Sequence, residues 1–189
     1  PMFERTEDQE ALADAVRTFC QDRIAPTAEE DDEAERFRKE LVQEMGEQGF
    51  CGVAIPEQHG GLGLGYQDYA VVLEEIAKVS ASYAVSVAVT GLPQMILTKF
   101  GTPAQQERWL PGLAAGELLG GFALSEPESG SDAGAMKSTA VRDGEDYVLN
   151  GTKFWITHGG FADVYVVMAR TGQPGPKGVS AFLVPGDTP

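Results

Sequence analysis

Apolar residues recur at helical spacing through the N-terminal part of the chain. Thr6, with Gln9 three residues later, fits a capping box and predicts a helix start. Five segments follow the helical pattern and end at proline, glycine or a new capping residue, at about residues 6–25, 37–49, 66–78, 82–100 and 102–111. Four glycines within residues 60–65 predict a long loop between the second and third helices, because so many glycines do not hold a helix.

One predicted helix is uncharged over most of its length. Residues 79–98 carry no charged side chain, and a segment of this length is long enough to cross a membrane. Several of its polar residues nevertheless recur every fourth position and form one stripe: Ser82, Ser86, Thr90, Gln94 and Thr98. The segment is too polar for lipid, so we expect a helix buried in protein and no membrane span.

From Leu118 onward the pattern changes to short β-type runs. Six strands are predicted, at 119–124, 138–141, 147–149, 153–157, 164–169 and 179–184. Asp143-Gly144 and Asn150-Gly151 have the residue types that hairpin turns require. Helices followed by strands predict an α+β protein or two domains, not an alternating parallel sheet. We expect an all-α domain at 1–116 and an antiparallel, β-barrel-like domain at 117–189. Residues after Val184 read as a connector, so we expect this second domain to be incomplete.

The chain is strongly acidic, and this makes negatively charged binding partners unfavourable. It carries 29 acidic and 14 basic residues, for a net charge of −15. This balance excludes nucleic-acid binding and electrostatic docking to anionic lipid as default interpretations. The densest acidic run, Glu29 to Glu33, is interpreted as a solvated helix flank or loop, because consecutive acids do not converge on one ion without a turn.

The cysteines and histidines indicate neither a disulfide framework nor a metal site. Cys20 and Cys51 are interpreted as small buried residues of a reducing compartment. His59 and His158 lie in glycine-rich loops without a cysteine or carboxylate at metal-ligand spacing, so no metal is expected. The first residues are charged and lack an apolar stretch, so we expect no signal peptide and a cytoplasmic location.

The first candidate site segment is the loop after the first predicted strand, within residues 122–132. The strand ends at Ser125, Pro127 prevents its continuation, and Gly130 permits a sharp turn. Serine and aspartate side chains of this segment are able to hydrogen-bond neighbouring backbone, and the exposed N–H groups and hydroxyls suit a polar ligand. On these residues alone, a plain connection between strand and turn is the simpler interpretation, and the turn by itself is a weak signal of a binding site.

The second candidate segment, residues 153–160, follows the predicted Asn150-Gly151 hairpin. In a strand, Trp155 and Thr157 would point to the same face. An aromatic ring beside a hydroxyl suits an aromatic heterocycle, which would stack on the ring and accept or donate one hydrogen bond. The alternative is a half-buried tryptophan on a sheet.

Together these segments resemble the acyl-CoA dehydrogenase family of flavoproteins. The resemblance covers essentially the whole chain, and the blocks occur in the family's order and separation. The motifs that carry it are Ile55-Pro56-Glu57 with Gly60-Gly61, Leu73-Glu74-Glu75-Ile76-Ala77, Lys99-Phe100-Gly101-Thr102, Ala123-Leu124-Ser125-Glu126-Pro127-Glu128-Ser129-Gly130-Ser131-Asp132 and Leu149-Asn150-Gly151-Thr152-Lys153-Phe154-Trp155-Ile156-Thr157.

The resemblance implies bound FAD. The residues at matching flavin-binding positions are Phe122, Ala123, Leu124, Ser125, Gly130, Ser131, Trp155, Ile156 and Thr157. By position, Ser125 would hydrogen-bond the pyrimidine end of the flavin, Trp155 would pack against its face, and Thr157 would hydrogen-bond near N5. Ser131 matches the position that meets the pantetheine arm of the CoA thioester. His158 stands where many members carry asparagine.

The resemblance also implies a substrate, a reaction and partners. The positions aligned with the acyl-tail site are Ala84, Val85, Ala88 and Leu92. A carboxylate removes the α-proton of an acyl-CoA while the β-hydrogen leaves as hydride to the flavin, which gives a trans-2-enoyl-CoA, as in fatty acid β-oxidation. Electrons then pass to an electron-transfer flavoprotein. Full-length relatives form dimers or tetramers, so a homo-oligomer is expected.

The catalytic base of the family lies in a C-terminal helical domain beyond residue 189, so no catalytic residue is assigned within this chain. For the same reason the carboxylates of Glu74, Glu75, Glu126 and Glu128 are not assigned this role. Glu74 and Glu75 are interpreted as surface or structural carboxylates, because no sequence feature near them marks a raised pKa. Two alternatives stay open. The scaffold also suits an oxygen-using acyl-CoA oxidase or flavin monooxygenase, and the chain itself suits a short, non-catalytic partner subunit.

Overall fold

The computed structural model describes residues 4–188, and their contacts form two compact units that divide between Leu118 and Leu119. The sequence pattern places this boundary after Gly116. The N-terminal unit is helical and the C-terminal unit is built on a β-sheet, so the predicted α+β class is confirmed.

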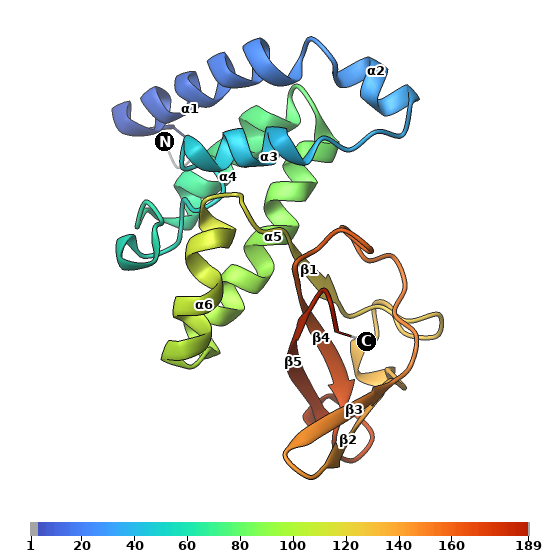
Figure 1. Cartoon of the computed structure of the whole chain (residues 1–189). Coiled ribbons are helices and arrows are strands. Elements are labelled where there is room, and N and C mark those ends of the chain that lie inside the picture. Colours follow the sequence, from blue (N-terminus) through green and yellow to red (C-terminus); the bar gives the residue numbers. More distant parts are fainter. Residues whose placement is uncertain (1–3, 189) are drawn as a thin grey trace. The chain divides into compact units, whose positions relative to one another are not determined.

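The helical unit buries apolar side chains from most of its helices, and Figure 1 shows how these helices are arranged within the unit. Its helices are α1 (Glu7–Phe19), α2 (Ala28–Glu33), α3 (Lys39–Glu47), α4 (Tyr66–Ala77), α5 (Ala81–Phe100) and α6 (Pro103–Ala114), with a π-helical turn at Cys20–Ile24. Helix α4 contacts α1 on one side and α5 on the other, and α5 also contacts α6. Both the Thr6 and Thr102 side chains complete capping boxes, as the pattern predicts for Thr6.

Two features of the helical unit differ from the sequence pattern. The sequence pattern predicts that the last helix ends near Pro111, but α6 continues past it to Ala114. The Pro111 side chain is exposed to solvent. The acidic run from Glu29 to Glu33 lies within helix α2. It is not solvated along its whole length, because the side chain of Asp31 turns inward and is 4% exposed. The two cysteines are buried, as predicted.

Helix α5 is the one helix among the described residues that is long and apolar enough to cross a membrane, and half of its most apolar window is buried within the protein. The middle of its polar stripe is buried: Ser86, Thr90 and Gln94 face the core, whereas Ser82 is exposed. Gln94 is 1% exposed and its amide donates to the carbonyl oxygens of Cys51 (3.0 Å) and Leu113 (3.2 Å). The apolar Val85, on another face, is 48% exposed. The helix therefore buries an amide that satisfies one carbonyl of a loop and one at the end of α6, and it leaves apolar groups accessible.

The C-terminal unit holds a five-stranded mixed sheet. Its strands are β1 (Gly120–Ala123), β2 (Thr139–Asp143), β3 (Asp146–Asn150), β4 (Val164–Arg170) and β5 (Val179–Pro185). β4 pairs in parallel with β1 and antiparallel with β5, and the antiparallel hairpin β2–β3 joins the end of β4 at Arg170 (Figure 1). The expectation of a purely antiparallel sheet is therefore wrong, because β4 pairs in parallel with both β1 and β2, and the pairings of the described strands do not close a barrel.

The predicted strand at 153–157 is absent. Trp155 has φ +57°, in the left-handed region, which interrupts extended backbone. The segment is instead an irregular connection between β3 and β4, and the same-face argument for Trp155 and Thr157 fails with the strand.

Candidate functional site

The bend after β1 is built by short backbone and side-chain hydrogen bonds. Glu126 and Ser129 exchange backbone hydrogen bonds of 2.8 and 3.1 Å, and the Ser129 hydroxyl donates to the carbonyl of Asp132 over 2.8 Å. This is the local hydrogen bonding expected of serine in such a turn. Gly130 and Ser131, which follow this turn, are exposed.

Glu126 anchors this bend from within. Its carboxylate accepts from the backbone N–H groups of Lys137 (2.6 Å) and Ser138 (3.0 Å) and from Lys153 Nζ (2.8 Å). Burial raises the pKa of Glu126, but the hydrogen bonds from Lys153, Ser138 and Lys137 outweigh it and lower this pKa to about 2. The carboxylate is thus ionised and fully engaged, which is unsuited to a general base.

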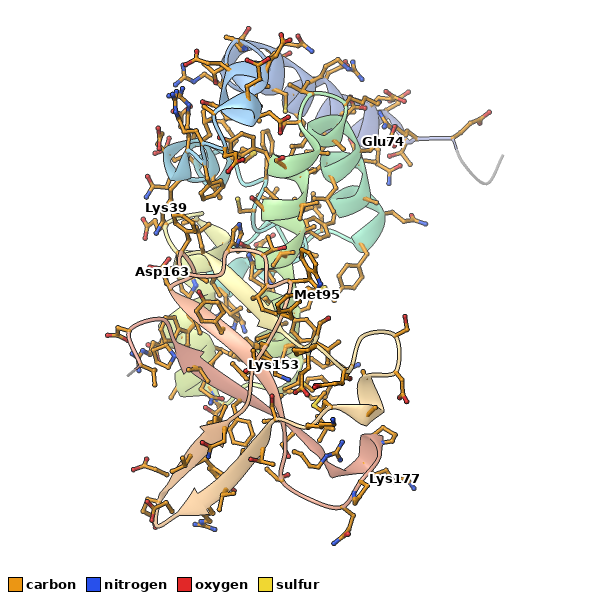
Figure 2. All side chains as sticks on the ribbon, turned by 90° about the vertical axis from the view of Figure 1, so that its right-hand side faces the viewer. Lys39, Glu74, Met95, Lys153, Asp163 and Lys177 are labelled. Atoms are coloured by element: carbon orange, nitrogen blue, oxygen red, sulfur yellow. The ribbon has the colours of Figure 1, made fainter. Side chains whose placement is uncertain are left out.

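The two candidate segments lie against each other. The Phe154 N–H donates to the Ser125 carbonyl over 2.8 Å. Lys153 Nζ donates to the Leu124 carbonyl over 3.1 Å as well as to Glu126. Three consecutive residues of the bend are therefore held by two consecutive residues of the second segment. Figure 2 shows Lys153 among the side chains of the β-unit.

Trp155 projects from this junction into the open. Its side chain is 87% exposed, and its ring meets Phe154 edge-on at a centroid distance of 5.1 Å. The alternative of a half-buried tryptophan on a sheet is wrong, because the indole is largely exposed and its segment forms no strand. Ile156 and Thr157 are half-buried.

His158 closes the second segment onto β1. Its Nδ1 lies 2.9 Å from the carbonyl oxygen of Gly120, which only accepts, so Nδ1 carries the hydrogen. Burial lowers the pKa of His158, so the ring is neutral near pH 7. Its φ is +63°, in the left-handed region, which histidine tolerates better than most residues other than glycine.

The polar groups of Ser125 and Thr157, which the sequence analysis assigns to flavin binding, are available to bind a planar ligand. The N–H and hydroxyl of Ser125 and the hydroxyl of Thr157 make no hydrogen bond within residues 4–188. Together with the exposed indole of Trp155 they offer two kinds of contact, ring packing and directed hydrogen bonds. A planar heterocycle with polar edges needs both.

The residues predicted to line the acyl tail do not share one environment. Val85 is 48% exposed and Ala88 and Leu92 are half-buried, but Ala84 is 7% exposed and turns toward the helical core. Three of the four positions therefore lie on the accessible apolar face of α5. Within the same unit a pocket of about 570 Å³ lies near the end of α5, lined by Ala54, Ile55, Tyr66, Met95, Ile96, Thr98, Lys99 and Phe100.

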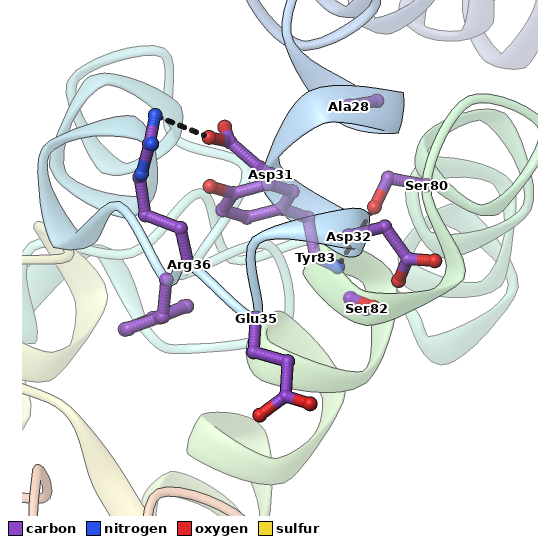
Figure 3. Close-up of a pocket in the computed structure, with 9 residues that line it drawn as sticks. Ala28, Asp31, Asp32, Glu35, Arg36, Ser80, Ser82 and Tyr83 are labelled. Carbon is purple, nitrogen blue, oxygen red and sulfur yellow. Dashed lines mark hydrogen bonds and ion pairs between the residues drawn. The ribbon is translucent and has the colours of Figure 1, made fainter.

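A second pocket, of about 280 Å³, lies between α2 and the start of α5 (Figure 3). The buried carboxylate of Asp31 pairs there with Arg36 (3.3 Å) and Arg38 (2.6 Å), and the hydrogen bond from Arg38 lowers the pKa of Asp31. These ion pairs hold the α2 loop, and we assign the pocket no ligand. In the part of the chain that the structure describes, no cluster of three or more His, Cys, Asp or Glu side chains is arranged to hold a metal ion.

Glu75 is buried between α4 and α1, whereas its neighbour Glu74 is 56% exposed. Arg5, Arg17 and Lys78 all donate to the Glu75 carboxylate. Glu75 therefore has a structural role, which is one of the roles that the sequence leaves open for it.

Comparison with known proteins covers both units. Residues 6–117 match the family model "Acyl-CoA dehydrogenase, N-terminal domain" and residues 121–189 match "Acyl-CoA dehydrogenase, middle domain". An acyl-CoA dehydrogenase of Bacillus subtilis is 40% identical over 186 residues, which is 97% of this chain and 49% of that protein. The chain thus spans about half the length of the curated relatives it matches.

Solved structures show the same likeness. A chain in a structure of the electron-transferring flavoprotein of Acidaminococcus fermentans superposes with a TM-score of 0.92 at 39% identity, over 99% of this chain and 50% of that one. A glutaryl-CoA dehydrogenase from Mycobacterium smegmatis in complex with FADH2 superposes with a TM-score of 0.92 at 36% identity, over 98% of this chain and 47% of that one.

Proposed function

Because the chain belongs to the acyl-CoA dehydrogenase family, we propose that it supplies the flavin-binding and acyl-binding part of an FAD-dependent acyl-CoA dehydrogenase. The observation that supports this most directly is the junction of the two candidate segments. It holds residues 124–126 against Lys153 and Phe154 and leaves the Ser125 N–H and the Trp155 indole available.

The residues of this junction fit FAD. Ser125 would donate to the pyrimidine edge of the flavin, Thr157 would hydrogen-bond near N5, and Trp155 would cover one face of the ring system. When bound, FAD supplies the acceptor for a hydride from the β-carbon of an acyl-CoA, so that a trans-2-enoyl-CoA forms. The protein's own contribution is to orient the ring and to exclude water from one face.

The helical unit would receive the acyl group. The exposed or half-buried side chains of Val85, Ala88 and Leu92 are uncharged and small to medium in size. Such a surface accepts an aliphatic chain without a penalty for desolvating a polar group. We do not place the base that removes the α-proton within this chain, because Glu75 and Glu126 are both saturated with hydrogen bonds.

We further propose that the reduced enzyme passes its electrons to an electron-transfer flavoprotein, that it works in the cytoplasm, and that it assembles as a homo-oligomer. The first of these proposals is supported by the likeness to a chain in a structure of the Acidaminococcus fermentans electron-transferring flavoprotein. Because the chain spans only about half the length of the curated relatives it matches, FAD affinity weaker than micromolar is expected for the 189-residue chain alone.

The test begins with the coding DNA beyond the codon for Pro189. If the reading frame continues, the longer protein is purified and is expected to be yellow and to lose its absorbance near 450 nm, roughly the flavin band, on anaerobic addition of an acyl-CoA. No bleaching with straight or branched acyl-CoAs of short to long chain would contradict the proposal. Peroxide release with oxygen uptake during turnover would indicate an oxidase instead, and a stop codon after Pro189 would favour a partner subunit.

A further inference from the structure

We propose that Lys153, neutralised by Glu126, is a positioning residue for the flavin. It fixes and polarises the Leu124–Ser125 peptide so that the Ser125 N–H is presented as a hydrogen-bond donor. This inference rests on the proposed function, because it concerns the same flavin segments, but it names residues that would act through another group rather than touch the cofactor.

The first observation is the confinement of the Lys153 side chain. Its Nζ lies 2.8 Å from Glu126 Oε1 and 3.1 Å from the Leu124 carbonyl oxygen. The Lys153 side chain is 12% exposed and that of Glu126 is 3% exposed. A lysine ammonium in this setting exchanges its partners with water far less readily than a surface lysine does.

The second observation is the geometry of the peptide that Lys153 grips. The described residues contain no cis peptide bond, so the Leu124 carbonyl and the Ser125 N–H point in opposite directions from one planar unit. With the carbonyl held by Lys153, the Ser125 N–H is directed away from the lysine. The next peptide is held in the same way, because the Ser125 carbonyl accepts from the Phe154 N–H over 2.8 Å.

The third observation is electrostatic. An ammonium bound to a carbonyl oxygen withdraws electron density from the peptide and makes the N–H at its other end a stronger donor. Glu126 balances the charge, so the site gains a polarised N–H without an unpaired buried cation. A donor at the edge of the flavin favours its reduced form, which carries more negative charge, and therefore raises the reduction potential of the bound cofactor.

A purely structural ion pair would behave differently. Its loss would lower the free energy of unfolding and leave the potential of correctly bound FAD unchanged. The positioning role predicts opposite shifts for the two partners. Removing the Lys153 ammonium weakens the donor and lowers the potential, whereas removing the Glu126 charge leaves an uncompensated ammonium nearby and raises the potential.

The experiment uses the full-length holoenzyme and compares Lys153→Met, Lys153→Arg and Glu126→Gln with the unmodified protein. Lys177→Met serves as a matched control, because Lys177 is an exposed loop lysine of the same unit (Figure 2). Two quantities are measured for each, the dissociation constant of FAD and the reduction potential of bound FAD, while thermal unfolding reports stability.

Lys153→Met is expected to raise the FAD dissociation constant roughly tenfold or more, the effect of losing a hydrogen bond from a charged donor, and to lower the potential. Lys153→Arg is expected to restore both values toward those of the unmodified protein, and Lys177→Met to change neither. Glu126→Gln keeps the shape and an acceptor oxygen, and it is expected to raise the potential even if Lys153→Met fails to fold.

The assignment would be overturned if the Lys153→Met protein binds FAD with an unchanged reduction potential. It would also be overturned if the reduction potential shifts in the same direction in the Lys153→Met and Glu126→Gln proteins. If Lys153→Met does not fold, an unchanged or lowered potential in Glu126→Gln would overturn it. If the unmodified full-length protein binds no FAD, the proposed function itself fails, and this outcome is distinct from a normal flavoprotein that is indifferent to Lys153.

Discussion

Replacing Glu75 by glutamine is expected to destabilise the helical unit at neutral pH. The Glu75 side chain is fully buried, and its carboxylate lies 2.9 Å from Arg5 Nη1, 3.2 Å from Arg17 Nε and 2.8 Å from Lys78 Nζ. These bonds join α4 to α1 and to the segment before it. Glutamine keeps the shape but removes the charge that all three cations share.

The size of the effect follows from the Glu75 pKa. Burial raises this pKa, but the hydrogen bonds from Lys78, Arg5 and Arg17 outweigh burial and lower it from 4.5 to about 2. That difference corresponds to about 3 kcal/mol of stability at neutral pH. Arg17 and Lys78 are about half exposed (47% and 52%) and recover water when the carboxylate is lost. A loss of about 2–3 kcal/mol is therefore expected.

The pH dependence has a definite sign. Because folding lowers the Glu75 pKa from 4.5 to about 2, the unfolded chain binds more protons than the folded chain between these pH values. The stabilisation by the Glu75 carboxylate is therefore complete above about pH 4.5. It is lost as the pH falls from about 4.5 toward about 2. The difference in unfolding free energy between the parent and the Glu75→Gln protein should therefore shrink over this range.

The assay is denaturant unfolding followed by the fluorescence of Trp109, which is 8% exposed in α6 and reports the helical unit. Trp155→Phe serves as the parent, because the chain has two tryptophans. Glu74→Gln is the matched control: this neighbour binds Arg5 and Lys78 but is 56% exposed, so a change of about 0–1 kcal/mol is expected. A loss as large for Glu74→Gln, or a Glu75→Gln effect independent of pH, would refute the reasoning.

Three further predictions concern packing and exposure. Gly46→Ala should destabilise the helical unit by about 1–3 kcal/mol in the same unfolding assay, although alanine favours helices, because a Cβ there collides with the backbone of Ala115; a gain in stability would contradict this. Cys20 and Cys51 should resist thiol reagents in the folded chain and react after denaturation, because burial raises their pKa values to about 11 and about 12; rapid labelling of either in the native protein would be inconsistent with its burial. Trp155 fluorescence should be quenched by iodide in the 189-residue chain and protected in FAD-loaded full-length protein; equal quenching in both would argue against a flavin at this ring.

The local patterns predicted most of the elements correctly. The capping box at Thr6 marks the start of α1, and the hairpin turn at Asp143-Gly144 lies between β2 and β3. These features depend on residues a few positions apart. The failures came where local rules were overridden: Pro111 is tolerated inside α6, and the left-handed conformation of Trp155 interrupts the expected strand.

The candidate site was predicted only in part. The motifs around Ser125 and Trp155 pointed to the two segments, but Lys153 and Glu126 were not recognised as the groups that hold them together. A lysine before an aromatic residue and a glutamate before a proline give no local sign of pairing. Their partnership is a contact across 27 positions of sequence.

By itself, the sequence determined the class of the fold, the positions of most helices and strands, and the family, because each of these is written in short-range periodicity, turn residues or contiguous motifs. The tertiary structure decided which charged side chains are buried in ion pairs and which remain exposed to solvent. Glu75 differs from Glu74, and Glu126 from Glu128, only in what surrounds it. Burial and pairing depend on residues brought together from distant parts of the chain, and these set the pKa of a carboxylate more strongly than its neighbours in sequence do.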